Sequence, residues 1–321
     1  MFQQLSVAVS LTAWDTASRT SEGVRSASTG YCAVMRVATF NILHGQRVLN
    51  GFDSAAVAAA AATPQAEELH AAIAGLHPDV LGLQEVDSHQ PRSGIVDQTL
   101  VAAAAMAVDH DPGQRRFVPA VVGTPGNRGT FSSATDADAD RAAAGSHPDH
   151  GPHYGVALIS VPHVLSWHRT RFDPAPLALP LLVPGTSRPQ VLSVPDEPRV
   201  AVAAVLHTPH GIATVATAHL SFVPGYNVSQ LRRLQRWLRQ FPRPLVLMGD
   251  FNLPGGIPEW VTGWPGIVRA PTYPTFGPRV RFDHILLDGF TEKAVAAAKA
   301  TVEIHRLPVS DHCAVSAEIT W

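Results

Sequence analysis

The sequence has little cysteine. Its 321 residues include two, Cys32 and Cys313, which are too few for a framework of several disulfides or for a structural zinc site built from cysteines. Disulfides persist in oxidising compartments and are rare in the cytosol. A reducing compartment, the cytoplasm, is therefore the default expectation for this chain.

An excess of charge of either sign is also missing. The 24 basic and 26 acidic side chains give a net charge of −2 and a pI near 6.8. Proteins that bind nucleic acid without sequence preference are usually basic, so this balance argues against a dedicated protein of that class. It still leaves room for a local basic groove.

Long apolar runs are absent as well. No apolar stretch reaches the roughly 18 residues of a membrane span, so we expect no transmembrane segment. Residues 1–34 contain neither a basic segment nor a sustained apolar one, so no secretory signal is expected. The small, polar "TASRTSEGVRSASTG" within them predicts disorder. We therefore expect a disordered tail at residues 1–34, natural or an artefact of start-codon choice, and a single domain at residues 35–321.

Strand and helix patterns alternate at the start of this domain. "MRVATFNIL" (residues 35–43) is rich in β-branched and aromatic residues, which is typical of a strand. A helix is expected to follow Thr63 and Pro64, which suit a cap and a first helical position. Residues 80–86 then form a buried apolar run with the pattern of a second strand. This order predicts a layered α/β fold.

The remainder of the domain has a less regular pattern. Residues 109–152 show little periodicity and are expected to be mostly loop. The proline-rich residues 173–198 predict an ordered excursion with short strands, and residues 208–211 the turn of a hairpin. "SQLRRLQRWLRQF" predicts an amphipathic helix with its leucines on the inner face.

Polar side chains stand at the ends of several predicted strands. In "PLVLMGDFNLPGG" an apolar strand ends with Asp250 and Asn252, which share one face because they are two residues apart. An unpaired buried carboxylate is costly, so this pair is either satisfied by partners or placed where a polar group binds. The pattern recurs at Asn41, Glu85, His219, Asp283, Asp311 and His312. Because sites in layered α/β folds form where strand ends converge, the recurrence predicts a functional site.

Part of this set has the chemistry of a metal site. Asn41, Glu85 and Asp311 offer carboxylate and amide oxygens. Such hard oxygen donors suit Mg²⁺ or Mn²⁺ better than zinc. We therefore expect these three residues to supply a site for a divalent cation.

The other residues suit acid–base work and anion binding. A histidine near a carboxylate is a poised acid or base, and His312 with Asp283 is the candidate pair. Asp250 can orient and polarise water, while Asn252 and His219 can donate hydrogen bonds to an anionic oxygen. A metal, an activated water and these donors together fit the hydrolysis of a phosphoester.

Seven segments of the chain resemble the endonuclease/exonuclease/phosphatase superfamily, in that family's order. They are "TFNILHG", "LGLQEVD", "YGVALIS", "ATAHLSF", "MGDFNLP", "RFDHIL" and "VSDHCAV", and the resemblance spans residues 37–319. The family includes deoxyribonuclease I, abasic-site endonucleases, neutral sphingomyelinases, inositol polyphosphate 5-phosphatases and poly(A)-removing exonucleases. The resemblance implies a four-layer α-β-β-α sandwich of two packed mixed sheets, with one metal-dependent catalytic site. It makes residues 35–321 a single catalytic domain of this type.

The resemblance also implies a role for each residue of the pattern. Asn41, Glu85 and Asp311 would surround the metal, Mg²⁺ or Mn²⁺. Asp250 would position or deprotonate the attacking water. The implied partner is a phosphoester substrate, which is a nucleic acid, a lipid or a small molecule, and no obligate protein partner is apparent.

The remaining roles concern the phosphate. Asn252 and His219 would hold it. His312, oriented by Asp283, would stabilise the pentacovalent transition state or act as a base. The resemblance leaves both roles of this histidine open.

Several of these residues also have purely structural explanations. "DFNLPGG" is rich in turn formers, and His219 could be a satisfied interior histidine, since the sequence identifies no partner for it. His284 alternates to the opposite strand face and is expected to be structural. Arg279 and Arg281, just before Asp283, are the arginines better placed to contact a phosphate. The histidine-rich "SHPDHGPH" is expected to be a loop rather than a metal cluster.

The sequence gives weaker evidence on which of the family's substrate classes this chain acts on. The family's 5-phosphatases carry a Trp–Cys–Asp–Arg signature where this chain has "VRFDHIL", which disfavours that branch. Residues 109–152 have many acids and few aromatics, unlike the basic, aromatic loops of DNA endonucleases. "PAPLALPLLVPG" (residues 174–185) is the sole candidate for the apolar, membrane-facing element of a sphingomyelinase.

Three hypotheses therefore stay open. The first is a metal-dependent phosphodiesterase or nuclease-like hydrolase. The second is a phosphomonoesterase or a lipid phosphodiesterase of the sphingomyelinase kind. The third is a non-catalytic binding module on the same fold, against which the complete set of eight polar residues argues.

Overall fold

Two mixed β-sheets form the core of the protein. The larger sheet contains β1 (Val34–Asn41), β2 (Val80–Ser88), β3 (Arg115–Gly123), β4 (Phe131–Ser133), β5 (His153–Ser160), β13 (Glu303–His305) and β14 (Ala314–Thr320). The smaller sheet contains β6 (Val164–Phe172), β9 (Arg199–Thr208), β10 (Gly211–His219), β11 (Leu245–Asp250) and β12 (Asp283–Asp288). The computed structural model describes residues 34–320 apart from 49–64, 127–128, 146–150 and 184–189.

The strand order mixes parallel and antiparallel neighbours. The larger sheet runs β13-β14-β1-β2-β5-β3-β4 and the smaller one β12-β11-β10-β9-β6. The pairs β1–β2 and β10–β11 are parallel, and the other pairs within these two sheets are antiparallel. A separate hairpin of β7 (Ala178–Val183) and β8 (Gln190–Pro195) lies between β6 and β9 in the chain, where an excursion with short strands was expected.

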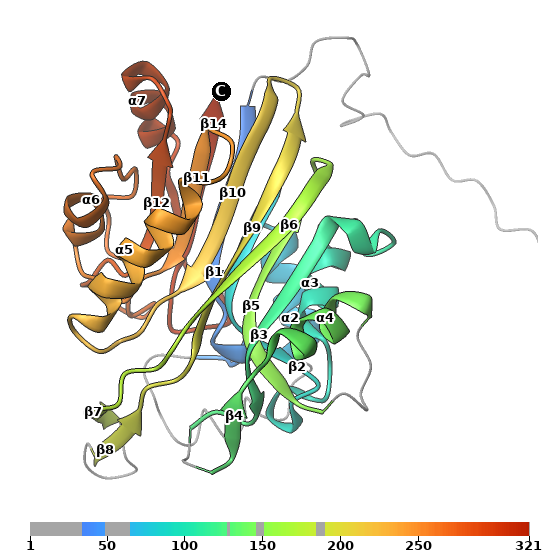
Figure 1. Ribbon diagram of the computed structural model, residues 1–321, viewed down its shortest axis with the longest axis vertical. Helices are drawn as coiled ribbons and strands as arrows, with labels where there is room; N and C mark the ends of the chain where they lie inside the picture. The colour runs from blue at the N-terminus through green and yellow to red at the C-terminus, as the bar shows by residue number, and fades with distance from the viewer. Residues whose placement is uncertain (1–33, 49–64, 127–128, 146–150, 184–189, 321) are drawn as a thin grey trace, which may run out of the picture. The chain divides into compact units, whose positions relative to one another are not determined.

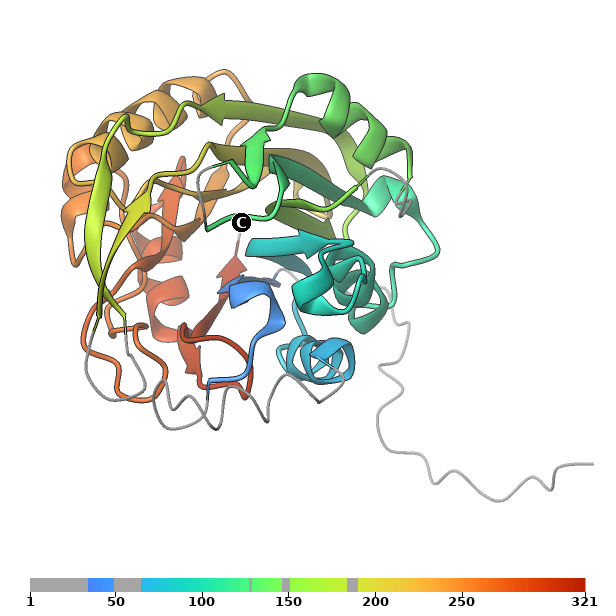
Figure 2. The same cartoon turned by 90° about the horizontal axis from the view of Figure 1, so that it is seen from below.

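Helices cover the outer faces of the two sheets (Figures 1 and 2). They are α2 (Gln65–Ala74), α3 (Gln98–Ala105), α4 (Asp136–Ala144), α5 (Tyr226–Leu238), α6 (Ile257–Thr262) and α7 (Glu292–Ala300), with 3-10 turns η1 (Leu43–Gly45), η2 (Pro91–Ser93) and η3 (Pro112–Gln114). None of these helices is long and apolar enough to cross a membrane.

Three apolar clusters hold the layers together. One fills the space between the sheets and includes Val37 and Val246. A second joins the larger sheet to α2 through Leu69 and Ile73, and a third joins the smaller sheet to α5, where Leu231 and two further leucines are buried as expected. The burial of apolar area on both faces of each sheet is the main stabilising contribution. The expected four-layer sandwich of two mixed sheets is confirmed.

The expectation that residues 109–152 are mostly loop is wrong. Strand β3 and helix α4 lie within them. The Asp-rich "TDADAD" begins α4 with a capping box, in which the Thr135 and Asp138 side chains each accept a hydrogen bond from the other's backbone N–H. Acidic residues in a first turn also favour the helix dipole. Periodicity missed β3 because its pairing with β5 shifts register between Pro119 and Val121.

Some expectations fall outside the described residues. The expected tail at residues 1–34 lies there except for Val34, which begins β1. Cys32, the cap at Thr63 and Pro64, and residues 146–150 of the histidine-rich segment lie there too. The extent of the single domain, residues 35–321, stays a prediction.

Candidate active site

The polar residues at the strand ends lie on the same strand faces as the apolar residues that fill the space between the two sheets. In β11, Val246 and Met248 belong to the core between the sheets, and Asp250 follows on the same face. The strands β1 and β10 show the same order of an apolar residue, a threonine or a second apolar residue, and then a polar site residue. In β1 these are Val37, Thr39 and Asn41, and in β10 they are Val215, Thr217 and His219. The site therefore lies at one end of the sandwich, where the apolar core gives way to polar side chains.

A polar layer separates this site from the apolar core. The Gln84 amide nitrogen donates hydrogen bonds to Thr217 Oγ1 (2.7 Å) and Thr39 Oγ1 (3.1 Å), and all three side chains are buried. This layer ties the two sheets together directly beneath the site. It satisfies groups that would be costly if left without partners.

Glu85 reaches the site through a β-bulge. The pairing of β2 with β5 shifts between Leu83 and Val86, and Glu85 has a φ of +58°. Its neighbours Leu81 and Leu83 lie in the cluster on the helix side of the sheet, so regular alternation would not bring Glu85 to the inter-sheet face. A bulge re-aims one side chain, and a positive φ outside glycine marks local strain that the surrounding structure must hold.

Asp250 lies at the centre of the site. Its Oδ2 accepts a hydrogen bond from Asn41 Nδ2 at 3.0 Å and lies 3.6 Å from the Nε2 atoms of both His219 and His312. Its Oδ1 accepts a hydrogen bond from the backbone N–H of Asn252 at 2.9 Å. Asn41 Nδ2 also donates to Glu85 Oε1 at 3.0 Å within the larger sheet, so Asn41 links Glu85 to Asp250 of the smaller sheet.

His312 is held from behind by Asp283. Its Nδ1 lies 2.8 Å from Asp283 Oδ2, and both residues are buried. The backbone N–H of His312 donates to Ser310 Oγ, and Ser310, with a φ of +76°, donates to the backbone oxygen of Asn41. Asp311 therefore lies on a short, fixed loop between these two anchors.

Glycine at position 249 permits the close approach of β10 and β11. Gly249 has a φ of +144°, and a Cβ at this position would lie 2.0 Å from the backbone oxygen of Ala218. The backbone also turns through a positive φ of +50° at Asn252, whose Nδ2 donates to the backbone oxygen of Leu220 at 3.0 Å. Asn252 is thus fixed between the ends of the two strands that carry His219 and Asp250.

The partner of His219, which the sequence did not identify, is Arg199. Arg199 Nη1 lies 3.2 Å from His219 Nδ1, and both side chains are buried. A signal for this contact exists in the sequence. The hairpin pairs Gly211 with Thr208 and Ala218 with Ala201, and continuing that register places Arg199 beside the end of β10.

Burial and mutual repulsion raise the pKa values of three carboxyls of the site. Burial raises the pKa of Asp250 to about 6, opposed by His312 and reinforced by Asp283. Burial likewise raises the pKa of Asp311 to about 6, and Glu85 adds to this shift. The pKa of Glu85 is raised mainly by burial, although its hydrogen bond from Asn41 opposes the shift.

The two histidines have opposite protonation states. Burial, the Arg199 charge and the His312 charge hold the pKa of His219 well below its usual range. Burial also disfavours a charged His312, but Asp283 and Asp250 outweigh it and raise the pKa of His312 well above 6.5. The environment therefore favours the neutral form of His219 and the charged form of His312.

The donor set fits a hard divalent cation. Glu85, Asp250 and Asp311 are oxygen donors whose pKa values are raised mainly by burial, and a bound cation would favour their ionised forms. Asp250, Asp283 and His312 also bring one ligand atom each within 4.8 Å of one another and could hold a metal ion. Of the expected ligands, Asn41 contacts both Glu85 and Asp250, and Asp311 directly precedes His312 of this second group.

Tyr273 lies at the site although no sequence motif marks it, and Arg281 does not have the expected role. The Tyr273 ring lies 4.8 Å from that of His312, and burial with the nearby Asp311 charge raises the Tyr273 pKa to about 12. Arg281 is not free to bind a phosphate, because its guanidinium donates to the backbone oxygens of Gly255 and Val268 and to Glu259. His284 is structural as expected, since its Nε2 lies 2.8 Å from the Leu253 backbone oxygen.

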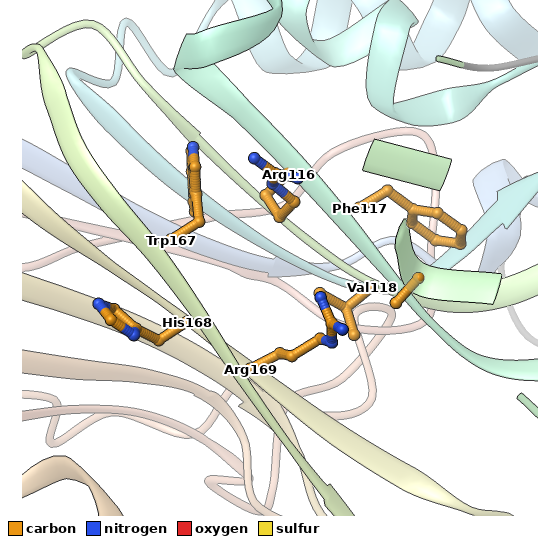
Figure 3. A pocket seen from close by; sticks show the side chains of 7 residues that line it. Arg116, Phe117, Val118, Trp167, His168 and Arg169 are labelled. Carbon is orange, nitrogen blue, oxygen red and sulfur yellow. The ribbon is translucent and has the colours of Figure 1, made fainter. Parts of the chain in front are cut away.

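A separate cavity lies away from these residues (Figure 3). It has a volume of about 220 Å³ and is lined by Arg116, Phe117, Val118, Ala139, Trp167, His168 and Arg169, from β3, α4 and β6. The Arg116 guanidinium lies over the Trp167 ring, 5.5 Å from its centre. None of the eight expected site residues lines this cavity.

The chain was compared with models of known families. The chain matches the model described as the Endonuclease/Exonuclease/phosphatase family over residues 38–312. This range contains all eight residues of the site. A search of curated proteins gave no match.

Solved structures share the fold at low sequence identity. An endonuclease/exonuclease/phosphatase of Beutenbergia cavernae is 17% identical with a TM-score of 0.53, over 89% of this chain and 71% of that one. A mannosyl-6-phosphatase of Bacteroides thetaiotaomicron is 15% identical with a TM-score of 0.50, over 89% of this chain and 100% of that one. A family protein of Leptotrichia buccalis is 13% identical with a TM-score of 0.50, over 89% and 100%. These likenesses concern the fold.

Proposed function

The chain belongs to the endonuclease/exonuclease/phosphatase family, and from this membership we propose that it is a divalent-metal-dependent phosphodiesterase or nuclease-like hydrolase. Water would attack phosphorus with Asp250 as the group that accepts its proton. The observation that carries this proposal is the position of Asp250 Oδ2, 3.6 Å from the Nε2 atoms of both His219 and His312. A buried base between two hydrogen-bond donors is the arrangement that an attack on an anionic phosphate needs.

The Asp250 carboxylate is suited to the role of proton acceptor. A base works best when its pKa lies near the working pH, and burial raises the pKa of Asp250 to about 6. The Asn252 N–H and the Asn41 amide hold Oδ1 and Oδ2 in place. The carboxylate can therefore orient a water molecule and take its proton at Oδ2 without first reorganising.

We assign the metal, Mg²⁺ or Mn²⁺, to Asn41, Glu85 and Asp311. When bound, the cation would polarise the phosphoryl group and neutralise charge that develops on its oxygens. Asp283 and His312 are less suited as ligands, because the Nδ1 atom of His312 already lies 2.8 Å from Asp283. An imidazolium also has no free lone pair for a metal.

The two histidines and Asn252 would bind the phosphoryl oxygens. His312 carries its charge because Asp283 and Asp250 raise its pKa, so we assign it as the cationic donor that stabilises the transition state rather than as a base. Its Nε2–H would donate while Asp283 holds Nδ1. His219, at the end of β10, and Asn252, two residues after the end of β11, would add neutral hydrogen bonds.

A phosphomonoesterase is the second candidate. The observation that favours it is the shared fold with a protein named as a mannosyl-6-phosphatase. The same residues would serve a monoester, since the attack on phosphorus needs the same base and donors. Which of the two ester classes the protein hydrolyses is therefore decided by the substrates that it cleaves.

A substrate panel tests the proposal. The purified protein would be incubated with Mg²⁺ or Mn²⁺ and bis(4-nitrophenyl) phosphate, 4-nitrophenyl phosphate, plasmid DNA, single-stranded RNA, sphingomyelin or an inositol phosphate. We expect cleavage of at least one diester, abolished by a chelator and restored by added metal. Preferential cleavage of monoesters would support the second candidate. Folded protein that binds the metal and cleaves nothing would contradict the proposal and favour a non-catalytic binding module.

A further inference from the structure

Arg199 contacts His219 and belongs to none of the motifs quoted from the sequence. It is the first residue of β9, and its side chain is 5% exposed. Its guanidinium lies 3.6 Å from Asp196 Oδ1 and packs over the ring of Phe222, with the carbon Cζ 5.9 Å from the ring centre. Asp196 Oδ2 in turn accepts hydrogen bonds from the Ser221 hydroxyl and the Ala175 N–H. Burial, the ion pair with Asp196 and the Phe222 ring thus confine the guanidinium beside His219.

This contact determines which nitrogen of His219 carries the proton. Arg199 Nη1 lies 3.2 Å from His219 Nδ1. A guanidinium has only donor groups, so a hydrogen bond here requires a free lone pair on Nδ1. A neutral imidazole with a free Nδ1 carries its proton on Nε2.

A competing contact on the other nitrogen is weaker. Asn252 Nδ2 lies 3.2 Å from His219 Nε2 and would also require a lone pair there. Both nitrogens of one imidazole are not free at once near neutral pH, so only one contact is a hydrogen bond. A charged donor binds about twice as strongly as a neutral one, and Asn252 Nδ2 already donates to the Leu220 backbone oxygen at 3.0 Å. The hydrogen bond with Arg199 therefore prevails.

We infer that Arg199 is a positioning residue that locks His219 as the neutral tautomer with its proton on Nε2. That N–H points toward the site, where Asp250 Oδ2 lies 3.6 Å away. The assignment of the tautomer does not depend on the proposed function. Its catalytic consequence does rest on that function, and this consequence is a hydrogen bond from Nε2–H to a phosphoryl oxygen. The positive charge of Arg199 also disfavours an imidazolium, so His219 serves as a donor without carrying charge.

Nitrogen NMR reads the tautomer directly. The wild-type protein would be labelled with ¹⁵N in its 16 histidines, and the His219 signals would be assigned by their loss in His219→Gln. At pH 7 we expect one neutral form with a protonated Nε2 and a bare Nδ1. An Nδ1-protonated form, a mixture of the two, or an imidazolium would overturn the inference, and this result needs no variant of Arg199.

Substitutions of Arg199 then test the cause. In Arg199→Met we expect a mixture of tautomers, because the donor to Nδ1 is gone. In Arg199→Lys, which keeps a charged donor, we expect the wild-type pattern. The control Arg232→Met removes an exposed arginine of α5 and should change nothing. An unchanged His219 pattern in Arg199→Met would overturn the inference.

Kinetics separate this inference from the proposed function. With bis(4-nitrophenyl) phosphate we expect kcat to fall about tenfold in Arg199→Met and to recover in Arg199→Lys. Wild-type kcat in Arg199→Met, together with an altered tautomer, would overturn the positioning role. If the wild-type protein cleaves no phosphoester while the NMR result holds, the proposed function fails and the tautomer assignment stands.

Discussion

Nε2 of His312 lies 3.6 Å from Oδ2 of Asp250, too far for a direct hydrogen bond and close enough for one small group to contact both atoms. Both atoms face the end of the space between the sheets. Asp283 holds the other nitrogen of His312 at 2.8 Å. A base and a cationic donor thus lie side by side as an ion pair with no direct hydrogen bond between them.

Asp283→Asn should impair catalysis far more than folding. The amide keeps the shape but loses the charge that favours the His312 imidazolium and fixes its Nδ1 proton. We expect kcat to fall about 10³-fold, with little change in melting temperature. Asp288→Asn, at the other end of β12, is the matched control. Equal kcat values for the two variants would contradict the role of Asp283.

Gly249→Ala should destabilise the fold. The new Cβ would lie 2.0 Å from the Ala218 backbone oxygen, at a φ of +144°. We expect the free energy of unfolding to fall by about 3 kcal/mol or more, measured by urea denaturation. Gly255→Ala is the control, because Gly255 has a φ of +59° but nothing lies within 4 Å of a new Cβ. For this variant we expect the free energy of unfolding to fall by about 1 kcal/mol. Similar losses in both variants would show that close approach at Gly249 is not the cause.

The rate should fall on the acid side of about pH 6. Burial raises the pKa of Asp250 to about 6, so the carboxylate that accepts the proton disappears below that pH. We expect kcat/KM to fall by about tenfold per pH unit below this point. The measurement is a pH–rate profile with bis(4-nitrophenyl) phosphate at a metal concentration well below Kd, so that the pKa of Asp250 in the metal-free protein applies. A profile that stays flat from about pH 5 to 8 would exclude Asp250 as the base.

Metal binding should stabilise the protein more at neutral than at acid pH. In the folded protein the pKa of Asp311 is raised to about 6. The contribution of Asp311 to the free energy of unfolding is therefore fully present below the pKa that this residue has in the unfolded chain. It is lost as the pH rises through about 6. A cation that compensates the ionised carboxylates restores this stability. At a metal concentration of about 100 times Kd we expect a rise in melting temperature of about 5 °C at pH 7, and less at pH 5.

Asp311→Asn tests whether the proposed ligands cause this effect. The variant should lose most of the metal-induced shift, whereas Asp288→Asn should keep it. An undiminished shift in Asp311→Asn would instead favour the group of Asp250, Asp283 and His312 as the metal site.

The strand-end pattern could be predicted from the sequence because alternation is local. Asp250 follows Val246 and Met248 at spacings of two, so an apolar row that ends in a carboxylate predicts where that carboxylate points. The same reasoning places Asn41 and His219. The family resemblance supplied the order of the motifs, and the four-layer fold followed from it.

Other features depend on backbone geometry that the sequence does not display. Glu85 would face the helix side by alternation, and only the bulge and its φ of +58° bring it to the site. Arg199 belongs to no motif, and its contact with His219 follows from the hairpin register rather than from residue type. Arg281 was misjudged because sequence proximity to Asp283 gives no information on which carbonyls surround its guanidinium.

The most direct test of the account is the turnover rate of Asp250→Asn. The substitution keeps the volume of the side chain and removes the proton acceptor at the centre of the site. With the best ester of the panel and saturating Mg²⁺ or Mn²⁺, we predict that kcat falls at least about 10³-fold while Asp288→Asn keeps the wild-type rate. A rate for Asp250→Asn within tenfold of the wild-type rate would contradict the assignment of Asp250 as the base that activates water.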